Sequence, residues 1–239
     1  MSTWFQFKQF TIHQEKTAMK VCTDACLFGA WVAKKLEYKR IKAENILDIG
    51  CGTGLLSLML VQKTEAQIDA VEIDENSYKQ ARENFDLTEW KERINIHHIS
   101  IIDFKTPKKY ELIISNPPFY EDQLKSTDAT RNNAMHTINL THLDLVNSLK
   151  KNLAKGGIAT ILLPYNSVQN FEKILNKKQL FVYEKLNVSH SPQHPFFRSL
   201  LLISENKKKL SESSVSIKNE EGDYSREFIE PLKDYYLNF

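Results

Sequence analysis

The sequence predicts an α/β protein built on a mostly parallel sheet with helices on both faces. Three observations support this prediction. From about residue 44 onward, short apolar runs alternate with segments of helical periodicity. A glycine-rich turn follows the first apolar run. The last two apolar runs are separated by residues 189–198, which contain no helical segment, so they are expected to form a closing hairpin with one antiparallel strand.

Seven strands are expected in this core, and we assign them to residues 45–49, 68–73, 94–99, 111–115, 158–163, 180–188 and 200–204. The runs NILDI, IDAVEI, ELIIS and IATILL are dominated by apolar residues, as in parallel strands that are covered on both faces. Helices are expected at 55–63, 75–85, 143–153 and 168–175. The helix at 75–85 carries its charges on one side, and the helix at 143–153 is expected to stop at Gly156 and Gly157.

Additions are expected at both ends of this core, which spans 44–205. In the N-terminal segment, 1–43, apolar residues alternate between Phe5 and Ile12, which indicates a short strand or hairpin. A helix capped by Thr23 or Asp24 follows and runs to about residue 35. The C-terminal extension, 206–239, begins with a polar stretch and ends with a helix near 225–236, and we expect it to pack on the core.

Composition places few limits on function. The 239 residues carry a net charge of only +2, so a strongly basic surface for nucleic acid is not indicated. Three cysteines, Cys22, Cys26 and Cys51, are too few for a disulfide framework, and we expect small buried side chains rather than a metal or redox site. There is no signal-peptide pattern and no apolar stretch long enough to span a membrane, so we expect a soluble, cytoplasmic protein, with a monomer favoured.

The glycine-rich turn carries the first candidate site. Asp48 is followed by Gly50, Gly52 and Gly54, where a strand turns into a helix. Glycines let the backbone approach a ligand closely, but the third glycine comes one residue too early for the dinucleotide pattern G-x-G-x-x-G. The turn therefore favours S-adenosylmethionine, which has no phosphate, and Asp48 is the candidate acid for its amino group.

Two further acids follow successive strands. Glu72 closes the second core strand, about 20 residues past the turn, where an acid can accept both ribose hydroxyls in this type of sheet. Asp103 follows the third core strand and is placed to accept from the adenine amine of the cofactor, with Ile102 and Phe104 flanking the ring. Together with Asp48, these acids predict an S-adenosylmethionine site.

The motif Asn116-Pro117-Pro118-Phe119 ends the fourth core strand and predicts the chemistry. The Asn116 side-chain oxygen and the Pro117 carbonyl can each accept an N–H from an exocyclic amine, which directs the nitrogen lone pair at a sulfonium methyl group. Phe119 can stack on a base that has been splayed out of its helix or loop. The motif suits adenine N6, guanine N2 or a glutamine amide, and it does not choose among them.

The sequence resembles the bacterial tRNA1(Val) (adenine-37-N6)-methyltransferases over nearly its whole length. The resemblance is carried by MKV with Thr23 and Asp24 near the N-terminus, LDIGCGTGLLSLMLVQKT, DAVEID, LIISNPPFY and the aromatic tail. It implies the class I methyltransferase fold, a Rossmann-like sheet of seven strands. It also implies N6 methylation of adenine-37 in tRNA1(Val), and it places Lys20 and Thr23 over the cofactor cleft.

Two arginines are candidates for contact with RNA. Arg131 lies in the polar stretch after the chemistry motif, and Arg198 follows an aromatic-rich loop. Both loops should project over the active-site edge of the sheet, where an arginine beside aromatic rings can bind phosphate and stack on bases. A surface ion pair is the alternative for each residue.

Three other functions share these motifs. A guanine-N2 methyltransferase of ribosomal RNA can carry the same Asn-Pro-Pro-Phe motif, but the N-terminal segment favours tRNA adenine. A glutamine-amide methyltransferase of release factors normally has a helical N-terminal domain, and fewer than about 45 residues precede the first core strand here. An RNA-binding module that has lost activity is the alternative outside enzymes, and intact Asp48, Glu72, Asn116 and Pro117 argue against it. We expect no metal.

Overall fold

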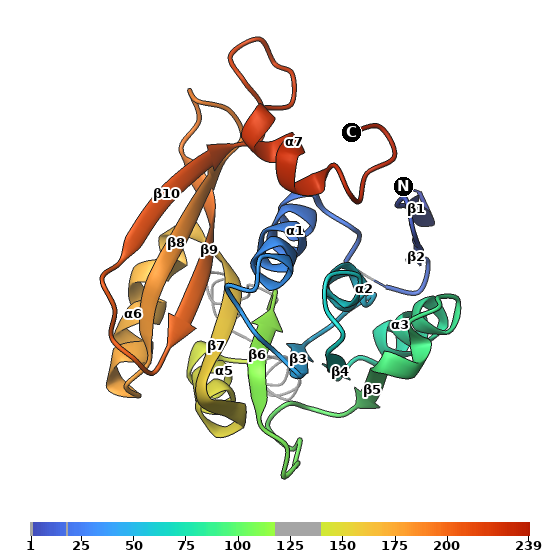
Figure 1. The fold of residues 1–239 in the computed structure, drawn as a ribbon, viewed down its shortest axis with the longest axis vertical. Helices are drawn as coiled ribbons and strands as arrows, with labels where there is room; N and C mark the ends of the chain where they lie inside the picture. The colour runs from blue at the N-terminus through green and yellow to red at the C-terminus, as the bar shows by residue number, and fades with distance from the viewer. Residues whose placement is uncertain (1, 18, 118–139) are drawn as a thin grey trace, which may run out of the picture.

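An eight-stranded sheet forms the centre of the computed structural model, which describes residues 2–17, 19–117 and 140–239 (Figure 1). The strand order is β10-β8-β9-β7-β6-β3-β4-β5. The strands of this sheet are β3 (Asn45–Ile49), β4 (Gln67–Glu72), β5 (Ile94–His98), β6 (Tyr110–Ser115), β7 (Leu153–Pro164), β8 (Phe181–Ser189), β9 (Phe196–Ser204) and β10 (Ser211–Ser216). The flanking helices are α1 (Thr23–Glu37), α2 (Leu55–Val61), α3 (Glu75–Asp86), α5 (His142–Asn152), α6 (Val168–Lys177) and α7 (Arg226–Leu232).

The predicted fold class is confirmed. The strands β5, β4, β3, β6 and β7 are parallel, while β9 runs antiparallel to both β7 and β8, as the closing hairpin required. The sheet has one strand more than the seven expected, because β10 pairs in parallel with β8 at the edge. Most of β10 is exposed and its sequence, SESSVS, contains a single large apolar residue, so hydrophobic patterning gives little signal for it.

The start of β7 differs from the sequence expectation. Gly156 and Gly157 do not end the preceding helix. That helix, α5, ends at Asn152, and both glycines lie within β7. The register between β6 and β7 shifts at this point, and a Cβ at position 157 would lie 2.9 Å from the Tyr110 carbonyl oxygen. Glycine is needed here because the neighbouring backbone comes too close for any side chain.

Two further details differ at element ends. The hairpin loop between β8 and β9 is shorter than expected, because β9 already begins at Phe196. The residue before α1 is Cys22, with no side-chain capping bond, so neither Thr23 nor Asp24 caps this helix. Cys22 is also exposed, against the expectation that all three cysteines are buried, whereas Cys26 and Cys51 are buried as expected.

The core consists of two apolar clusters, one on each face of the sheet. Side chains of α1, α2 and α7 contribute to one cluster, and those of α5 and α6 contribute to the other. The central strand β6 supplies both, with Leu112 and Ile114 on one face and Ile113 on the other, as alternation along a strand requires. No helix among the described residues is long and apolar enough to cross a membrane.

The two ends of the chain lie together (Figure 1). The strands β1 (Trp4–Gln6) and β2 (Thr11–His13) form the expected N-terminal hairpin. Phe7 pairs with Tyr236 in an isolated β-bridge, and the Lys8 ammonium donates to the carbonyl oxygens of Lys233 and Phe239. The N-terminal hairpin is therefore held by the last residues of the chain.

Candidate active site

The strand register brings the candidate residues to one edge of the sheet. Ile49 of β3 pairs with Val71 of β4 on one side and with Ser115 of β6 on the other. These strands are parallel, so the residues that follow them all emerge at the same edge. The glycine-rich turn, Glu72 and Asn116 are consequently neighbours at the carboxyl ends of β3, β4 and β6.

The glycines of the turn serve two purposes. Gly50 and Gly52 have φ angles of 68° and 57°, in the left-handed region that favours glycine, and a Cβ at either position would meet no atom within 4 Å. The backbone at these two residues is thus bare on the side where a ligand approaches. Gly54 is different, because its Cβ would lie 2.3 Å from the Phe85 ring, so this glycine lets α3 pack against the turn.

Asp48 lies fully buried beneath the turn. Its Oδ2 atom accepts a hydrogen bond of 2.7 Å from the Ser57 hydroxyl, while Oδ1 has no partner among the described residues. Burial is the largest cause that raises the pKa of the Asp48 carboxyl to about 7, the hydrogen bonds from Ser57 oppose this rise, and the charge of Glu72 adds to it. A buried oxygen without a partner is costly, so it marks a place where a donor from a ligand would be stabilising.

Glu72 is held in position by backbone donors. Its Oε2 atom accepts a 2.8 Å hydrogen bond from the amide of Gly52, and Oε1 accepts one of the same length from the amide of Asp74. The side chain is buried, although it carries a carboxylate. Each oxygen has a second lone pair, so a carboxylate held in this way can still accept from a ligand such as a diol.

Asp103 is exposed in the turn after β5. The amides of Asp103 and Phe104 both donate to the Ser100 carbonyl oxygen at 3.0 Å, which closes this turn. Ile102 is also exposed, at 53%, but Phe104 is turned into the core, where its ring lies 5.1 Å from that of His97. Phe104 therefore does not flank an open binding surface, in contrast to the sequence expectation.

The Asn-Pro corner begins where β6 ends. The Ser115 hydroxyl donates to the Ile49 carbonyl oxygen at 2.8 Å, which joins the ends of β6 and β3. Asn116 is half-buried and Pro117 is buried at this junction. Phe119 lies outside the described residues, as does Arg131.

The other two cofactor candidates lie just before α1 and at its first residue. The Lys20 ammonium donates to the carbonyl oxygens of Gln14 and Thr17, so it closes a turn of its own segment. Thr23 is the first residue of α1 and is partly buried. At the same end of α1, Asp24 Oδ2 accepts a 2.8 Å hydrogen bond from Arg198 Nε, an ion pair that links α1 to the start of β9.

Known proteins share both the sequence and the fold. The model of the family "Methyltransferase small domain" matches residues 29–183. A tRNA1(Val) (adenine(37)-N6)-methyltransferase of Trichodesmium erythraeum is 41% identical over 98% of both chains, and one of Flavobacterium psychrophilum is 37% identical over 98% of this chain and 99% of its own. The chain belongs to the tRNA1(Val) (adenine(37)-N6)-methyltransferase family. The predicted family is thereby confirmed.

Solved structures support the fold of this methyltransferase. The crystal structure described as a predicted O-methyltransferase from Agrobacterium tumefaciens has a TM-score of 0.67 and 15% identity, over 90% of this chain and all of that one. The N-methyltransferase NodS of Bradyrhizobium japonicum, in complex with S-adenosyl-L-homocysteine, has a TM-score of 0.53 and 16% identity, over 73% of this chain and 84% of its own. At such identities the likeness concerns the fold alone.

S-adenosylmethionine is the cofactor of this methyltransferase family, and the residues at the sheet edge fit it. Asp48 Oδ1, which no described residue contacts by a hydrogen bond, offers an acceptor, and Gly50 and Gly52 leave space where any other residue would place a Cβ. Glu72 lies one strand away and is held by the amide of Gly52 in the same turn.

Sequence reasoning missed Asn84, which couples the N-terminal segment of the methyltransferase to the cofactor turn. This fully buried side chain on α3 donates to the carbonyl oxygens of His13 and Thr53, each at 2.9 Å, and its Oδ1 accepts from the His13 amide at 3.0 Å. Nearby, Gln80 accepts from the Lys16 amide. Both residues are polar, so hydrophobic periodicity assigns them to the exposed face of the helix.

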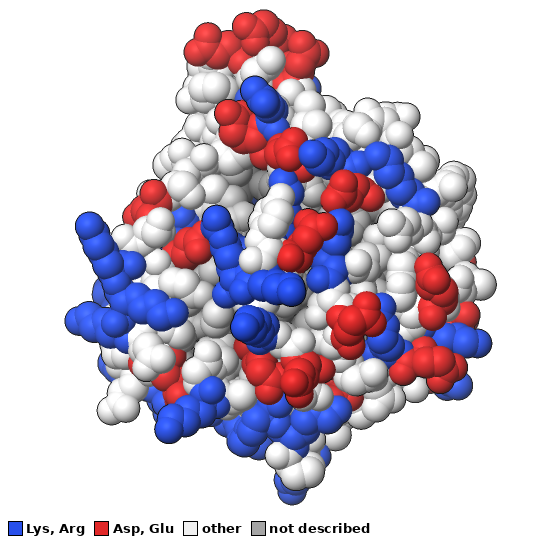
Figure 2. Space-filling view, viewed as in Figure 1, with Lys and Arg blue, Asp and Glu red and all other residues white. Residues whose placement is uncertain are grey.

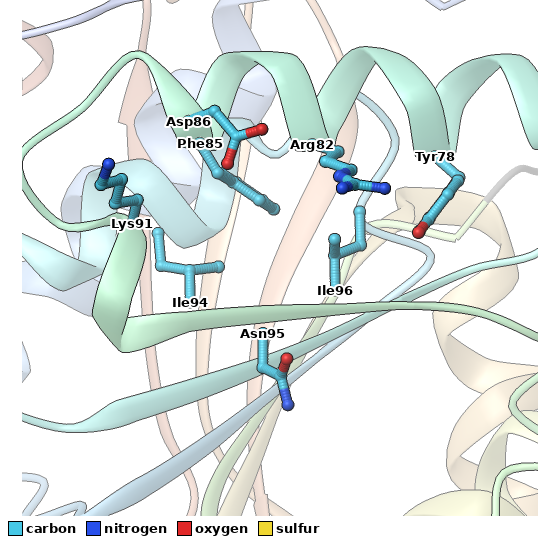
Figure 3. Close-up of a pocket in the computed structure, with 8 residues that line it drawn as sticks. All are labelled: Tyr78, Arg82, Phe85, Asp86, Lys91, Ile94, Asn95 and Ile96. Carbon is cyan, nitrogen blue, oxygen red and sulfur yellow. The ribbon is translucent and has the colours of Figure 1, made fainter.

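One hollow of the described surface lies away from this site. It measures about 250 Å³ and is bounded by α3 and the edge strand β5, with Arg82 and Lys91 on its rim (Figure 3). The strand β5 is at the end of the sheet, two strands from β3 and three from β6. This hollow is therefore separate from the Asn-Pro corner.

Proposed function

We propose that this methyltransferase transfers the methyl group of S-adenosylmethionine to N6 of adenine-37 in tRNA1(Val). The near full-length similarity to relatives of that name carries the proposal. The similarity is decisive for the base, because the Asn-Pro corner alone suits any exocyclic amine. The partner is tRNA, and we place the reaction in the cytoplasm, where tRNA is modified. The monomer favoured by the sequence stays a prediction.

The cofactor would be held by residues from three parallel strands and the segment before α1. Asp48 would accept from its amino group, Glu72 from its ribose hydroxyls and Asp103 from its adenine amine. Gly50, Gly52 and Gly54 give the turn its shape, and Lys20 and Thr23 would cover the cleft from the N-terminal side. When bound, the cofactor supplies an electrophilic methyl group on a positively charged sulfur.

The Asn-Pro corner would prepare the amine for attack. The lone pair of adenine N6 is delocalised into the ring, so the nitrogen is a weak nucleophile. The side-chain oxygen of Asn116 and the carbonyl oxygen of Pro117 would each accept one N–H, which directs the lone pair toward the methyl carbon. Asn116 and Pro117 would hold the nitrogen in line with the methyl carbon during the transfer, which would leave the cofactor as a neutral thioether, and N6 would then lose one proton to solvent.

Substrate contacts outside the corner remain proposals. Phe119 would stack on the extruded adenine, and Arg131 and Arg198 would contact the RNA backbone. Arg198 already forms an ion pair with Asp24, so any contact it makes with RNA involves the junction of α1 and β9.

Nucleoside analysis of a defined substrate tests this function. Purified protein, labelled S-adenosylmethionine and unmodified tRNA1(Val) transcript are expected to yield N6-methyladenosine at position 37, and Asn116→Ala is expected to abolish it. A transcript with guanine at position 37 is the matched control. The same assay is repeated with ribosomal RNA and with a release factor as substrates. Methylation of guanine in the RNA, or of glutamine in the release factor, together with unmodified adenine in the tRNA, would reject the proposal.

A further inference from the structure

An exposed aromatic pair extends the active-site edge beyond the Asn-Pro corner. Tyr165 directly follows the last residue of β7, and Phe196 is the first residue of β9. Their ring centroids lie 5.4 Å apart with an interplanar angle of 49°, and the two residues are 40% and 37% exposed. These rings support each other but leave much of their surface open to solvent.

The sheet topology places this pair next to the proposed target site. The strand β7 is the direct neighbour of β6, with Ser115 paired to Ile161, so the two strands lie about 4.8 Å apart. From Ile161, β7 continues to Pro164, about 10 Å at the rise of a strand. Tyr165 consequently projects past the corner that begins at Asn116, on the side away from the cofactor turn.

The charge around the pair suits nucleic acid. Neither 164–171 nor 189–198 contains an acidic residue, although acids make up 30 of the 239 residues of the chain. The second segment includes His190, whose ring stacks on Phe197 at 4.0 Å, and Arg198, whose guanidinium carbon lies 5.5 Å from the Phe197 ring centroid. Arg198 is already paired with Asp24, so these segments offer exposed rings in a setting of nearly balanced charge, where unpaired bases can stack without an excess of negative charge nearby.

We infer that Tyr165 and Phe196 form a stacking site for an unpaired base adjacent to the target adenine. The inference rests on the proposed function, because it assigns the pair to the same RNA substrate. Extrusion of the target base unstacks its neighbours, and an aromatic platform one strand away offers them a replacement partner. Base stacking on aromatic side chains tolerates any base, so the site contributes affinity rather than sequence selection.

Steady-state kinetics with unmodified tRNA1(Val) transcript test the inference. The double variant Tyr165→Ala/Phe196→Ala is expected to raise the KM for tRNA by about tenfold or more, since one stacked base contributes that much. Its affinity for S-adenosylhomocysteine is expected to match that of the unaltered protein, because neither ring belongs to the cofactor site. Tyr165→Phe and Phe196→Tyr, which keep the rings, are expected to retain the original KM. Tyr38→Ala is the matched control, because Tyr38 is an exposed aromatic residue at the C-terminal end of α1, whereas the N-terminal end of α1 is the one linked to Arg198.

A fluorescent base makes the contact directly visible. Two transcripts are prepared, one with 2-aminopurine directly before adenine-37 and one with it directly after. The fluorescence of one of these two probes is expected to be quenched when the transcript binds the unaltered protein, and to stay unquenched with the double variant. An unchanged KM in the double variant, or quenching that persists in it, would overturn the stacking site while tRNA methylation stands. Absence of methylation by the unaltered protein would instead reject the proposed function.

Discussion

The Asp48 carboxyl is fully buried, one of its oxygens has no partner within the described part of the chain, and burial raises its pKa to about 7. A carboxyl in this state is near half-ionised at neutral pH. The ammonium group that it would bind in the cofactor interacts well only with the ionised form. The affinity of the site for S-adenosylmethionine is therefore coupled to a proton.

The first prediction concerns this coupling. Cofactor affinity is expected to fall by about tenfold for each pH unit below the Asp48 pKa, and binding near pH 6.5 should release a proton. Calorimetry in buffers of different ionisation enthalpy measures both.

The same pKa shift affects stability. Because the folded pKa is raised, the contribution of Asp48 to the free energy of unfolding is fully present below its unfolded pKa of about 4 and is lost as pH rises to about 7. Asp48→Asn should remove both dependences, and a persistent proton release would contradict the assignment.

The second prediction distinguishes the binding role of Gly52 from the packing role of Gly54. Gly52→Ala and Gly54→Ala each place an alanine at positive φ, at a cost of about 1–2 kcal/mol. Only Gly54→Ala also drives a Cβ into the Phe85 ring, so it should lower the free energy of unfolding considerably more. Gly52→Ala should chiefly weaken S-adenosylmethionine binding. Chemical denaturation and calorimetry on both variants check this, and equal loss of stability would argue against the packing role of Gly54.

At the scale of elements, α3 connects the N-terminal segment to the cofactor turn. The side-chain amide of Asn84 hydrogen-bonds directly to the backbone of His13 and to the carbonyl oxygen of Thr53. The same helix is also attached through Gln80, which accepts a hydrogen bond from the Lys16 amide, and through a surface ion pair between Lys16 and Glu83. The segment that carries Lys20 is thus positioned by polar residues of α3, in addition to the contacts that the hairpin makes with the end of the chain.

The third prediction follows from this connection. Asn84→Ala leaves buried backbone groups of His13 and Thr53 unpaired, which should reduce the free energy of unfolding by about 1–3 kcal/mol. It should also weaken cofactor binding through displacement of the turn at Thr53. Lys79→Ala on the same helix breaks only a solvent-exposed pair with Glu75 and should leave the free energy of unfolding nearly unchanged. Equal effects of the two substitutions would show that Asn84 does not position the turn.

Sequence patterns predicted the elements that bury apolar residues and missed those held by polar or steric contacts. The strands β3 to β6 and the site at their ends followed from apolar runs and glycine spacing. The strand β10 was missed because its stabilising contacts are backbone hydrogen bonds, and the position of Gly157 was misread because its function depends on the Tyr110 backbone, which is remote in sequence. Asn84 was missed for the same reason, since its partners lie on other segments.

At the scale of the whole molecule, charge gives little indication of where RNA binds. On the visible face Asp and Glu gather at the top and Lys and Arg are most frequent on the left, while the two are interspersed elsewhere (Figure 2), and the net charge is only +2. Affinity for tRNA must then come from local contacts, such as those of the aromatic pair Tyr165 and Phe196, rather than from a general positive field. The feature of the whole molecule that does bear on the site is the pairing of its two chain ends, which holds the N-terminal hairpin in place.

The fourth prediction concerns those ends. Tyr235 donates from its hydroxyl to the Met59 carbonyl oxygen of α2 at 2.9 Å, and its own carbonyl accepts from the Lys8 amide. Removal of residues 234–239 should lower the melting temperature and weaken cofactor binding, since the N-terminal hairpin loses its partner. Tyr235→Phe, which deletes only the hydroxyl, should cost about 1–3 kcal/mol in stability because the Met59 oxygen stays buried. A truncated protein with unchanged cofactor affinity would refute the link.

The bridge between Phe7 and Tyr236 also has a consequence for how the protein is made. Synthesis runs from the N-terminus, so Phe7 emerges from the ribosome long before its partner Tyr236 is translated. The N-terminal segment that carries Lys20 would then reach its final position only after Tyr236 has emerged. A nascent chain stalled before Tyr235 should accordingly bind S-adenosylhomocysteine more weakly than the released protein.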